Sequence, residues 1–226
     1  MIDQLSRNDE SARDDIGGSL VDSLLSQEVT GIAASLTDVI VSQLTSEDVL
    51  GCVPVFGAIF NLYKGYITVQ DHLNLKKIAY FLAGCEKKDS YEKTKFEKQL
   101  EIDGKLRTKV GEDLLLILGG IDNFEKAAFI GKVFMGRLRE EIDEKTFYIL
   151  ATTIKNASIA DLRALQLSYN KIATYDAKLG KPFSDTLDEA TAQSLFSVGL
   201  VKANGAVETA YSHNELGSRL LTLLKH

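Results

Sequence analysis

The segment from Glu47 to Lys77 constrains the fold most strongly, because it is long, nearly uncharged and unlike the rest of the chain. It reads EDVLGCVPVFGAIFNLYKGYITVQDHLNLKK, and its apolar and aromatic run stops at Asp71 and the Lys76–Lys77 pair. Residues 49–69 approach the roughly twenty residues that a membrane-spanning helix needs. A proline, three glycines, an asparagine and a lysine interrupt this run, so we do not expect a stable span.

Two interpretations of this segment remain open. If its helical face lies at the surface, its aromatic and aliphatic side chains would bind a partner protein or a membrane interface, with nearby lysines meeting acidic head groups. The contact residues predicted on this interpretation are Val55, Phe56, Ile59, Phe60, Leu62, Lys64, Lys76 and Lys77. If the face is buried, the segment is the central core helix, and its small glycines allow neighbouring helices to approach closely.

The composition of the chain is that of a helical protein. Its 226 residues include two prolines and no tryptophan, and Leu, Ala, Lys and Glu are frequent. A hydrophobic content of 45% is sufficient for one sizeable core, or for a core and a small additional module. We therefore expect a mainly α fold built as a multi-helix bundle.

Helix start signals divide the bundle. A capping residue stands three positions before an acid in the pairs Asp89–Glu92, Asp122–Glu125, Ser158–Asp161 and Thr186–Glu189. Together with apolar periodicity, they predict helices over residues 71–84, 90–102, 104–118, 123–141, 144–157, 159–173 and 187–202. Apolar residues at helical spacing also predict a helix over 19–45, or two helices joined near residue 31.

Charge and turn residues suggest the domain limits. The first fifty residues hold two basic and ten acidic residues, which disfavours nucleic-acid binding through the N-terminus. Residues 1–18 are polar and acidic, so we expect them to form a flexible leader. They lack the pattern of a secretory signal, so we expect a cytoplasmic protein. If the apolar segment is exposed, the protein would be peripherally associated with a membrane. The bundle is predicted over 19–174, a linker over 175–184 and a C-terminal module over 185–226.

The C-terminal module reads as a helix, a turn at Asn204–Gly205, a strand pair through Val207–Tyr211 and a closing helix from Asn214. This order resembles the end of a winged-helix domain, a small α+β fold. The resemblance implies a recognition helix and a wing that carry cations to DNA. The candidate cations are Lys202, Arg219 and Lys225. Four acids accompany them, so we expect a packing or partner module, with a nucleic-acid-binding regulator as the alternative.

A second resemblance lies in residues 122–150, DNFEKAAFIGKVFMGRLREEIDEKTFYIL. The stretch resembles a motif of bacterial helical stress and phage-defence proteins of the TerB-like tellurite-resistance and abortive-infection kinds. The matching residues are Glu125, Lys126, Ala127, Phe134, Ile142, Asp143 and Phe147. The resemblance implies a role in bacterial antiviral defence or stress response and, in some members, metal bound by acids at helix ends. The acids here lack the order of a calcium loop, so we expect no metal.

Catalytic patterns are not recognisable in the sequence. The three histidines, His72, His213 and His226, lie far apart and outside any zinc-binding spacing. A nucleophile elbow of the G-x-S-x-G form is missing, and the glycines do not spell a phosphate loop. Cys52 and Cys85 are isolated in apolar surroundings, as expected for reduced thiols. We therefore expect a non-enzymatic protein without cofactor that acts through a protein partner, self-association or a membrane.

Overall fold

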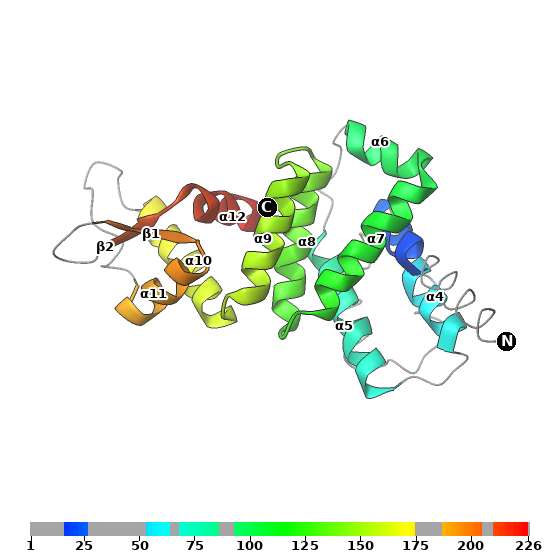
Figure 1. Ribbon diagram of the computed structural model, residues 1–226, viewed down its shortest axis with the longest axis horizontal. Helices are drawn as coiled ribbons and strands as arrows, with labels where there is room; N and C mark the ends of the chain where they lie inside the picture. The colour runs from blue at the N-terminus through cyan, green and yellow to red at the C-terminus, as the bar shows by residue number, and fades with distance from the viewer. Residues whose placement is uncertain are drawn as a thin grey trace. The chain divides into compact units, whose positions relative to one another are not determined.

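The computed structural model describes residues 16–26, 53–63, 68–85, 93–174, 187–204 and 210–225. These residues are mainly helical and include one antiparallel two-stranded sheet (Figure 1). The predicted mainly α class is confirmed. The chain divides into two compact units, Met1–Asp143 (unit 1) and Glu144–His226 (unit 2), and each is described by itself.

Unit 1 begins, within the described residues, with a helix over 16–25. Its other described helices are α4 (Pro54–Tyr63), α5 (Val69–Gly84), α6 (Lys95–Ile102), α7 (Gly104–Gly119) and α8 (Phe124–Leu138). Unit 2 contains α9 (Glu144–Asn156), α10 (Ile159–Thr174), α11 (Glu189–Ser197), β1 (Val201–Asn204), β2 (Ala210–His213) and α12 (Glu215–Lys225). In the sheet, Val201 lies opposite His213 and Asn204 opposite Ala210.

Most helix predictions are confirmed to within about three residues at each end. The helix predicted over 90–102 begins only at Lys95, because Thr94 caps it by accepting from the amide of Glu97 at 3.2 Å. The helix predicted over 187–202 ends at Ser197, because Gly199 turns the chain with a φ of 78° into β1.

Two predicted caps are shifted along the chain. Asn123, not Asp122, caps α8 by accepting from the amide of Glu125 at 2.8 Å. Asp188 caps α11 by accepting from the amide of Thr191 at 2.9 Å. Thr186, the residue predicted to cap this helix, lies outside the described residues, and so does the predicted capping pair Asp89–Glu92. The pattern was ambiguous because neighbouring short polar residues satisfy the same spacing.

The start of α10 follows the prediction only in part. Ser158 does accept from the amide of Ala160, at 3.2 Å. Asp161 instead accepts from the hydroxyl of Ser194 at 2.6 Å, which joins α10 to α11. A side chain predicted to act within its own helix therefore fixes a neighbouring one.

The core of unit 1 centres on the pairing of α5 with α8 (Figure 1). The rings of Phe81 and Phe134 meet at a centroid distance of 6.0 Å, and both side chains are buried. Glycines bring the two backbones together, since a Cβ on Gly84 would lie 2.1 Å from the carbonyl oxygen of Ala128. Close packing at glycines is predicted for the 49–69 segment, whereas this contact uses Gly84, which lies beyond that segment.

The helix over 16–25 begins inside the segment predicted as a leader. Gly17 is buried, and a Cβ on Gly111 of α7 would lie 1.9 Å from the carbonyl oxygen of Gly17. Residues 16–18 therefore belong to the packed body. The remainder of the helix predicted over 19–45, from residue 27 onward, lies outside the described residues.

The division into two compact units falls between Asp143 and Glu144. The linker predicted over 175–184 lies outside the described residues and stays a prediction. Glycine and proline signal irregular backbone, but a division between compact units depends on where few contacts cross.

In unit 2, Asn214 connects the hairpin to α12. Its Nδ2 group donates to the carbonyl of Gly199 at 2.7 Å, while its Oδ1 atom accepts from the amide of Gly217 at 2.8 Å. The observed order of helix, hairpin and helix agrees with the prediction, but the bounds differ. The closing helix predicted from Asn214 begins at Glu215. The first strand, Val201–Asn204, lies where the sequence predicts the end of a helix and a turn, ahead of the strand pair predicted through Val207–Tyr211.

Candidate functional site

The predicted contact residues on α4 are buried where they are described. Val55 and Phe56 are 0% exposed and Ile59 is 7% exposed. Placement of the side chains of Phe60 and Leu62, and of Lys64, lies outside the described residues. The described side chains of α4, apart from the exposed Pro54 at its start, therefore face the core of unit 1 or its margin.

Both lysines at the end of the segment contact unit 1 itself. Lys77 donates from its Nζ atom to the carbonyl oxygen of Gly119 at 3.1 Å. Burial lowers the pKa of Lys77, an effect that the nearby Asp122 carboxylate opposes. The Nζ atom of Lys76 lies 4.6 Å from the centroid of the Phe124 ring, a cation–π geometry. Both lysines thus hold α5 against the turn between α7 and α8.

The outer side of α5 carries a stripe that is exposed at its start and half-buried further along, which we call the α5 stripe. It consists of Val69, Leu73, Lys76 and Tyr80, whose spacing of four, three and four residues places them on one helical face, together with Phe124 of α8. Val69 is 80% exposed and Leu73 is 40% exposed. The rings of Tyr80 and Phe124 stack at a centroid distance of 5.7 Å.

Sequence reasoning missed this stripe. In the sequence, Val69 is the last residue of the apolar segment, and Leu73 lies in the helix predicted over 71–84. Helical spacing could have placed the two on one face. It could not have shown that this face lies outside, because buried and exposed apolar stripes have the same spacing.

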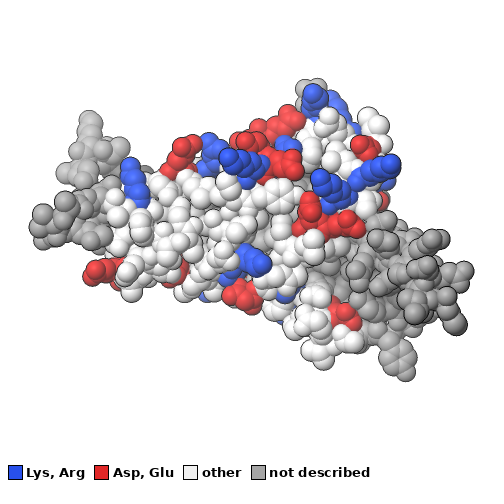
Figure 2. Space-filling model, viewed as in Figure 1, with Lys and Arg blue, Asp and Glu red and all other residues white. Residues whose placement is uncertain are grey.

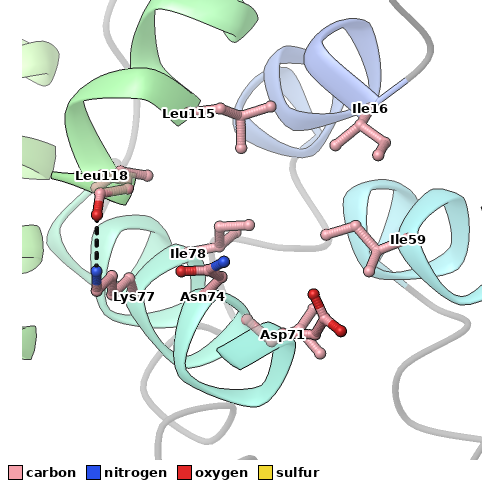
Figure 3. A pocket seen from close by; sticks show the side chains of 10 residues that line it. Ile16, Ile59, Asp71, Asn74, Lys77, Ile78, Leu115 and Leu118 are labelled. Carbon is pink, nitrogen blue, oxygen red and sulfur yellow. Dashed lines mark hydrogen bonds between the residues drawn. The ribbon is translucent and has the colours of Figure 1, made fainter. Parts of the chain in front are cut away.

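The opposite side of α5 borders a hollow of about 180 Å³ (Figure 3). Its walls are the side chains of Ile16, Ile59, Leu75, Ile78, Leu115 and Leu118, with Gly119 at one end. Its polar edge is a row along α5 formed by Asp71, Asn74 and Lys77. Figure 3 shows the apolar side chains of three further helical segments converging above this row.

The carboxylate of Asp71 is engaged at the start of α5. It accepts from the amide of Thr68 at 2.9 Å and from the hydroxyl of Thr68 at 2.5 Å. Thr68 in turn accepts from the amide of Asp71, so the pair is a capping box. The Oδ1 atom of Asn74 accepts from Gln70 at 3.2 Å.

The candidate nucleic-acid residues of unit 2 come from different elements. Lys202 is exposed on β1, and Lys225 is exposed at the end of α12. Arg219 forms an ion pair of 3.1 Å with Glu215, one turn earlier in α12. The helix before the hairpin, α11, reads EATAQSLFS and holds neither Lys nor Arg. On the face shown in Figure 2, the described basic side chains lie among acidic ones.

Most of the matching residues of the 122–150 motif are buried inside their own unit. Ala127, Phe134, Ile142 and Phe147 are all buried. Lys126 is also buried, and its Nζ atom lies 2.7 Å from the carboxylate of Asp122. These contacts explain the motif residues as parts of the packing of each unit.

In the described part of the chain, no group of three or more His, Cys, Asp or Glu side chains is arranged to hold a metal ion. No described helix is both long and apolar enough to cross a bilayer. The described thiol, Cys85, is buried and lies 3.5 Å from the carbonyl oxygen of Gly131.

Comparison of the chain with protein-family models, with curated proteins and with solved structures found no match.

Proposed function

We propose that this protein acts without catalysis by binding another protein through the α5 stripe. The observation that supports the proposal is the exposure of Val69 and Leu73, which lie one turn apart beside Lys76 and the Tyr80–Phe124 stack. Single exposed apolar residues are common on protein surfaces, whereas an apolar pair next to aromatic rings and a cation is typical of binding surfaces. The proposal keeps an interaction role for the end of the apolar segment and assigns its buried part to the core.

The chemistry of the stripe defines the kind of partner. Two apolar side chains at a spacing of four residues fit against the apolar face of an amphipathic helix. Lys76 favours a carboxylate on that partner, at a position beside the apolar contact. We therefore propose a protein segment that presents aliphatic residues next to an acid. Because residues 122–150 resemble a motif of bacterial stress and phage-defence proteins, we propose that this binding serves a defence or stress response in the cytoplasm.

Site-specific photo-crosslinking in cells tests the proposal. A photoreactive phenylalanine analogue replaces Leu73 in one variant and Leu116 in the other. Leu116 is the matched control, because it is 76% exposed in unit 1 but lies on α7. We expect a protein adduct of discrete mass from position 73 only. Adding Val69→Asp or Lys76→Glu should abolish the adduct.

Val69→Asp is chosen so that loss of binding does not reflect unfolding, whereas Lys76→Glu also removes the contact with the Phe124 ring. Val69 is the first residue of α5, where an acid interacts favourably with the helix dipole. Its exposure limits the expected change in stability to about 0.5 kcal/mol. Equal adducts at both positions, or an adduct that survives Val69→Asp, would contradict the proposal.

Peripheral membrane binding is the competing outcome. Co-sedimentation with acidic and neutral liposomes distinguishes it, because lysines favour acidic lipids. If Val69→Asp abolishes liposome binding and position 73 yields no protein adduct, the stripe binds lipid and the protein-partner proposal is wrong.

We further infer that unit 2 uses its winged-helix-like order of elements for packing or partner binding and not for DNA. The absence of Lys and Arg from α11 supports this inference, because that helix would have to contact DNA. The alternative, a nucleic-acid-binding regulator, requires binding that weakens steeply with salt and falls on Lys202→Ala or Arg219→Ala. Measurement of duplex DNA binding at two salt concentrations decides between them.

A further inference from the structure

The hollow beside α5 combines an apolar interior with hydrogen-bond donors at one edge. Six aliphatic side chains line it, and its volume of about 180 Å³ slightly exceeds that of cavities known to hold benzene, about 150 Å³. A site of this size accommodates one compact ring or a branched aliphatic group. It is too small for a nucleotide or a long lipid chain.

The polar edge offers donors to such a ligand. The Oδ1 atom of Asn74 accepts from Gln70, and the Nδ2 group of the same amide is a donor that a ligand can use. Lys77 gives one hydrogen bond to the carbonyl of Gly119, and an ammonium group has three N–H donors. Both side chains line the hollow from the same side of α5.

The acid on this edge lies away from the lysine. Figure 3 places Asp71 near Ile59 and Lys77 near Leu118, at opposite ends of the row. The Asp71 carboxylate is committed to Thr68 in the capping box. The other acid, Asp122, lies near Lys77 but is paired with Lys126 at 2.7 Å. With both carboxylates engaged elsewhere, the lysine end of the hollow is the end suited to an anion.

We propose that this hollow binds a small carboxylic acid with a compact apolar body, such as an aromatic or branched aliphatic monocarboxylate. The body fills the space between Ile16, Ile78 and Leu115. The carboxylate accepts hydrogen bonds from Asn74 and Lys77. Charge complementarity supports this choice, because the ammonium of Lys77 is partly removed from water and gains from an anionic partner. The site is distinct from the α5 stripe, and its test does not depend on a protein partner.

Isoleucine methyl NMR of the full-length protein with benzoate as the probe tests the proposal. The δ1 methyl signals of Ile16, Ile59 and Ile78 should shift in a saturable manner. Those of Ile102 and Ile149, which are exposed elsewhere, should not. The signal of Ile130, buried in α8, reports whether each variant is folded.

Two neighbouring leucines of α7 provide matched variants. Leu115→Trp fills the hollow and should abolish the benzoate shifts, while Leu116→Trp, on the exposed side, should leave them unchanged. Asn74→Trp, which puts a much larger side chain at the partly exposed edge, is a second blocking variant and keeps the test valid if Leu115→Trp fails to fold. Shifts that persist in either folded blocking variant would overturn the site.

A second comparison tests the chemical class of the ligand. Lys77→Met should weaken benzoate binding on the order of tenfold or more, since a charge-assisted hydrogen bond is lost. Toluene, which has no acceptor, should bind the native protein and this variant equally. If Lys77→Met leaves benzoate affinity unchanged, or if benzoate shifts no methyl signal of the hollow, the proposal is wrong.

Discussion

The backbone amide of Val55 donates a 3.0 Å hydrogen bond to the hydroxyl oxygen of Ser23, thirty-two residues earlier in the chain. Ser23 is fully buried and itself donates to the carbonyl of Ser19 at 2.8 Å. Val55 is the second residue of α4, so its amide has no acceptor within its own helix. The helix over 16–25 therefore caps α4 and fixes its position in unit 1.

Replacing this cap should destabilise unit 1. Ser23→Ala leaves the Val55 amide buried without its acceptor, and we expect the free energy of unfolding to fall by about 1–2 kcal/mol. Chemical denaturation monitored by circular dichroism measures the change. Ser19→Ala is the matched control, because Ser19 contributes its carbonyl and not its hydroxyl to the contact. Equal stability of the two variants would show that the hydrogen bond is unimportant.

The burial of Phe56 leads to a second prediction. Phe56→Ala removes a side chain that is fully enclosed, and this should cost about 3–5 kcal/mol of stability. Phe56→Asp should unfold unit 1, because the carboxylate would be buried without a partner. Thermal unfolding measures both, with the exposed Val69→Asp as the control. A Phe56→Asp protein with native stability would show that Phe56 is not a core residue and that α4 is available for binding a partner.

The sequence predicted the helices well because their evidence is local. The helix predicted over 71–84 is Val69–Gly84, and the one predicted over 159–173 is Ile159–Thr174, since apolar periodicity and caps act within a few residues. Local evidence does not decide whether the apolar segment is core or surface. Val55, for example, packs beside Ser23, which belongs to another helix and is distant in the sequence.

Contacts between distant parts of the chain also decide which side chains lie at the surface, and the sequence does not reveal them. Lys77 looked like a cation available to lipid, but it bonds the carbonyl of Gly119, forty-two residues away. Conversely, the sequence does not single out Val69 and Leu73 as a pair exposed on one face. Composition records which residues are apolar, whereas exposure depends on which helix packs against which face.

The close approach of α5 to α8 makes a third prediction. Because a Cβ on Gly84 would lie 2.1 Å from the carbonyl oxygen of Ala128, Gly84→Ala forces the helices apart. We expect a loss of about 1–3 kcal/mol. Gly57→Ala in α4 is the control, since a Cβ there meets nothing within 4 Å, and it should stabilise the helix by about 0.5–1 kcal/mol. Denaturant midpoints of the two variants should move in opposite directions.

The ion pair between Lys126 and Asp122 makes a fourth prediction. The hydrogen bond from Lys126 lowers the pKa of Asp122 below its ordinary value of 3.8. A carboxyl whose pKa is lower in the folded state contributes stability above pH 3.8, and this is lost as the pH falls through the folded pKa. Lys126→Met should raise the Asp122 pKa toward 3.8, as measured by carboxyl-carbon NMR titration. An unchanged titration would show that the contact does not persist in solution.

Acid should weaken unit 2 through His213. Burial lowers the pKa of His213 below its ordinary value of 6.5, so the folded state favours the neutral imidazole. Stability is therefore full above pH 6.5 and is lost as the pH falls toward the folded pKa, by at most about 1.4 kcal/mol per pH unit for one proton. His213 lies opposite Val201 in the hairpin and directly precedes Asn214, so protonation should first loosen the junction between the hairpin and α12, where Asn214 bonds the carbonyl of Gly199. Hydrogen exchange of α12 amides between about pH 8 and about pH 5 measures this effect, after correction for intrinsic exchange rates. In His213→Gln the acid-dependent increase in exchange should disappear, while His72→Gln in α5 should retain it; the same increase in both variants would assign the acid sensitivity to another group.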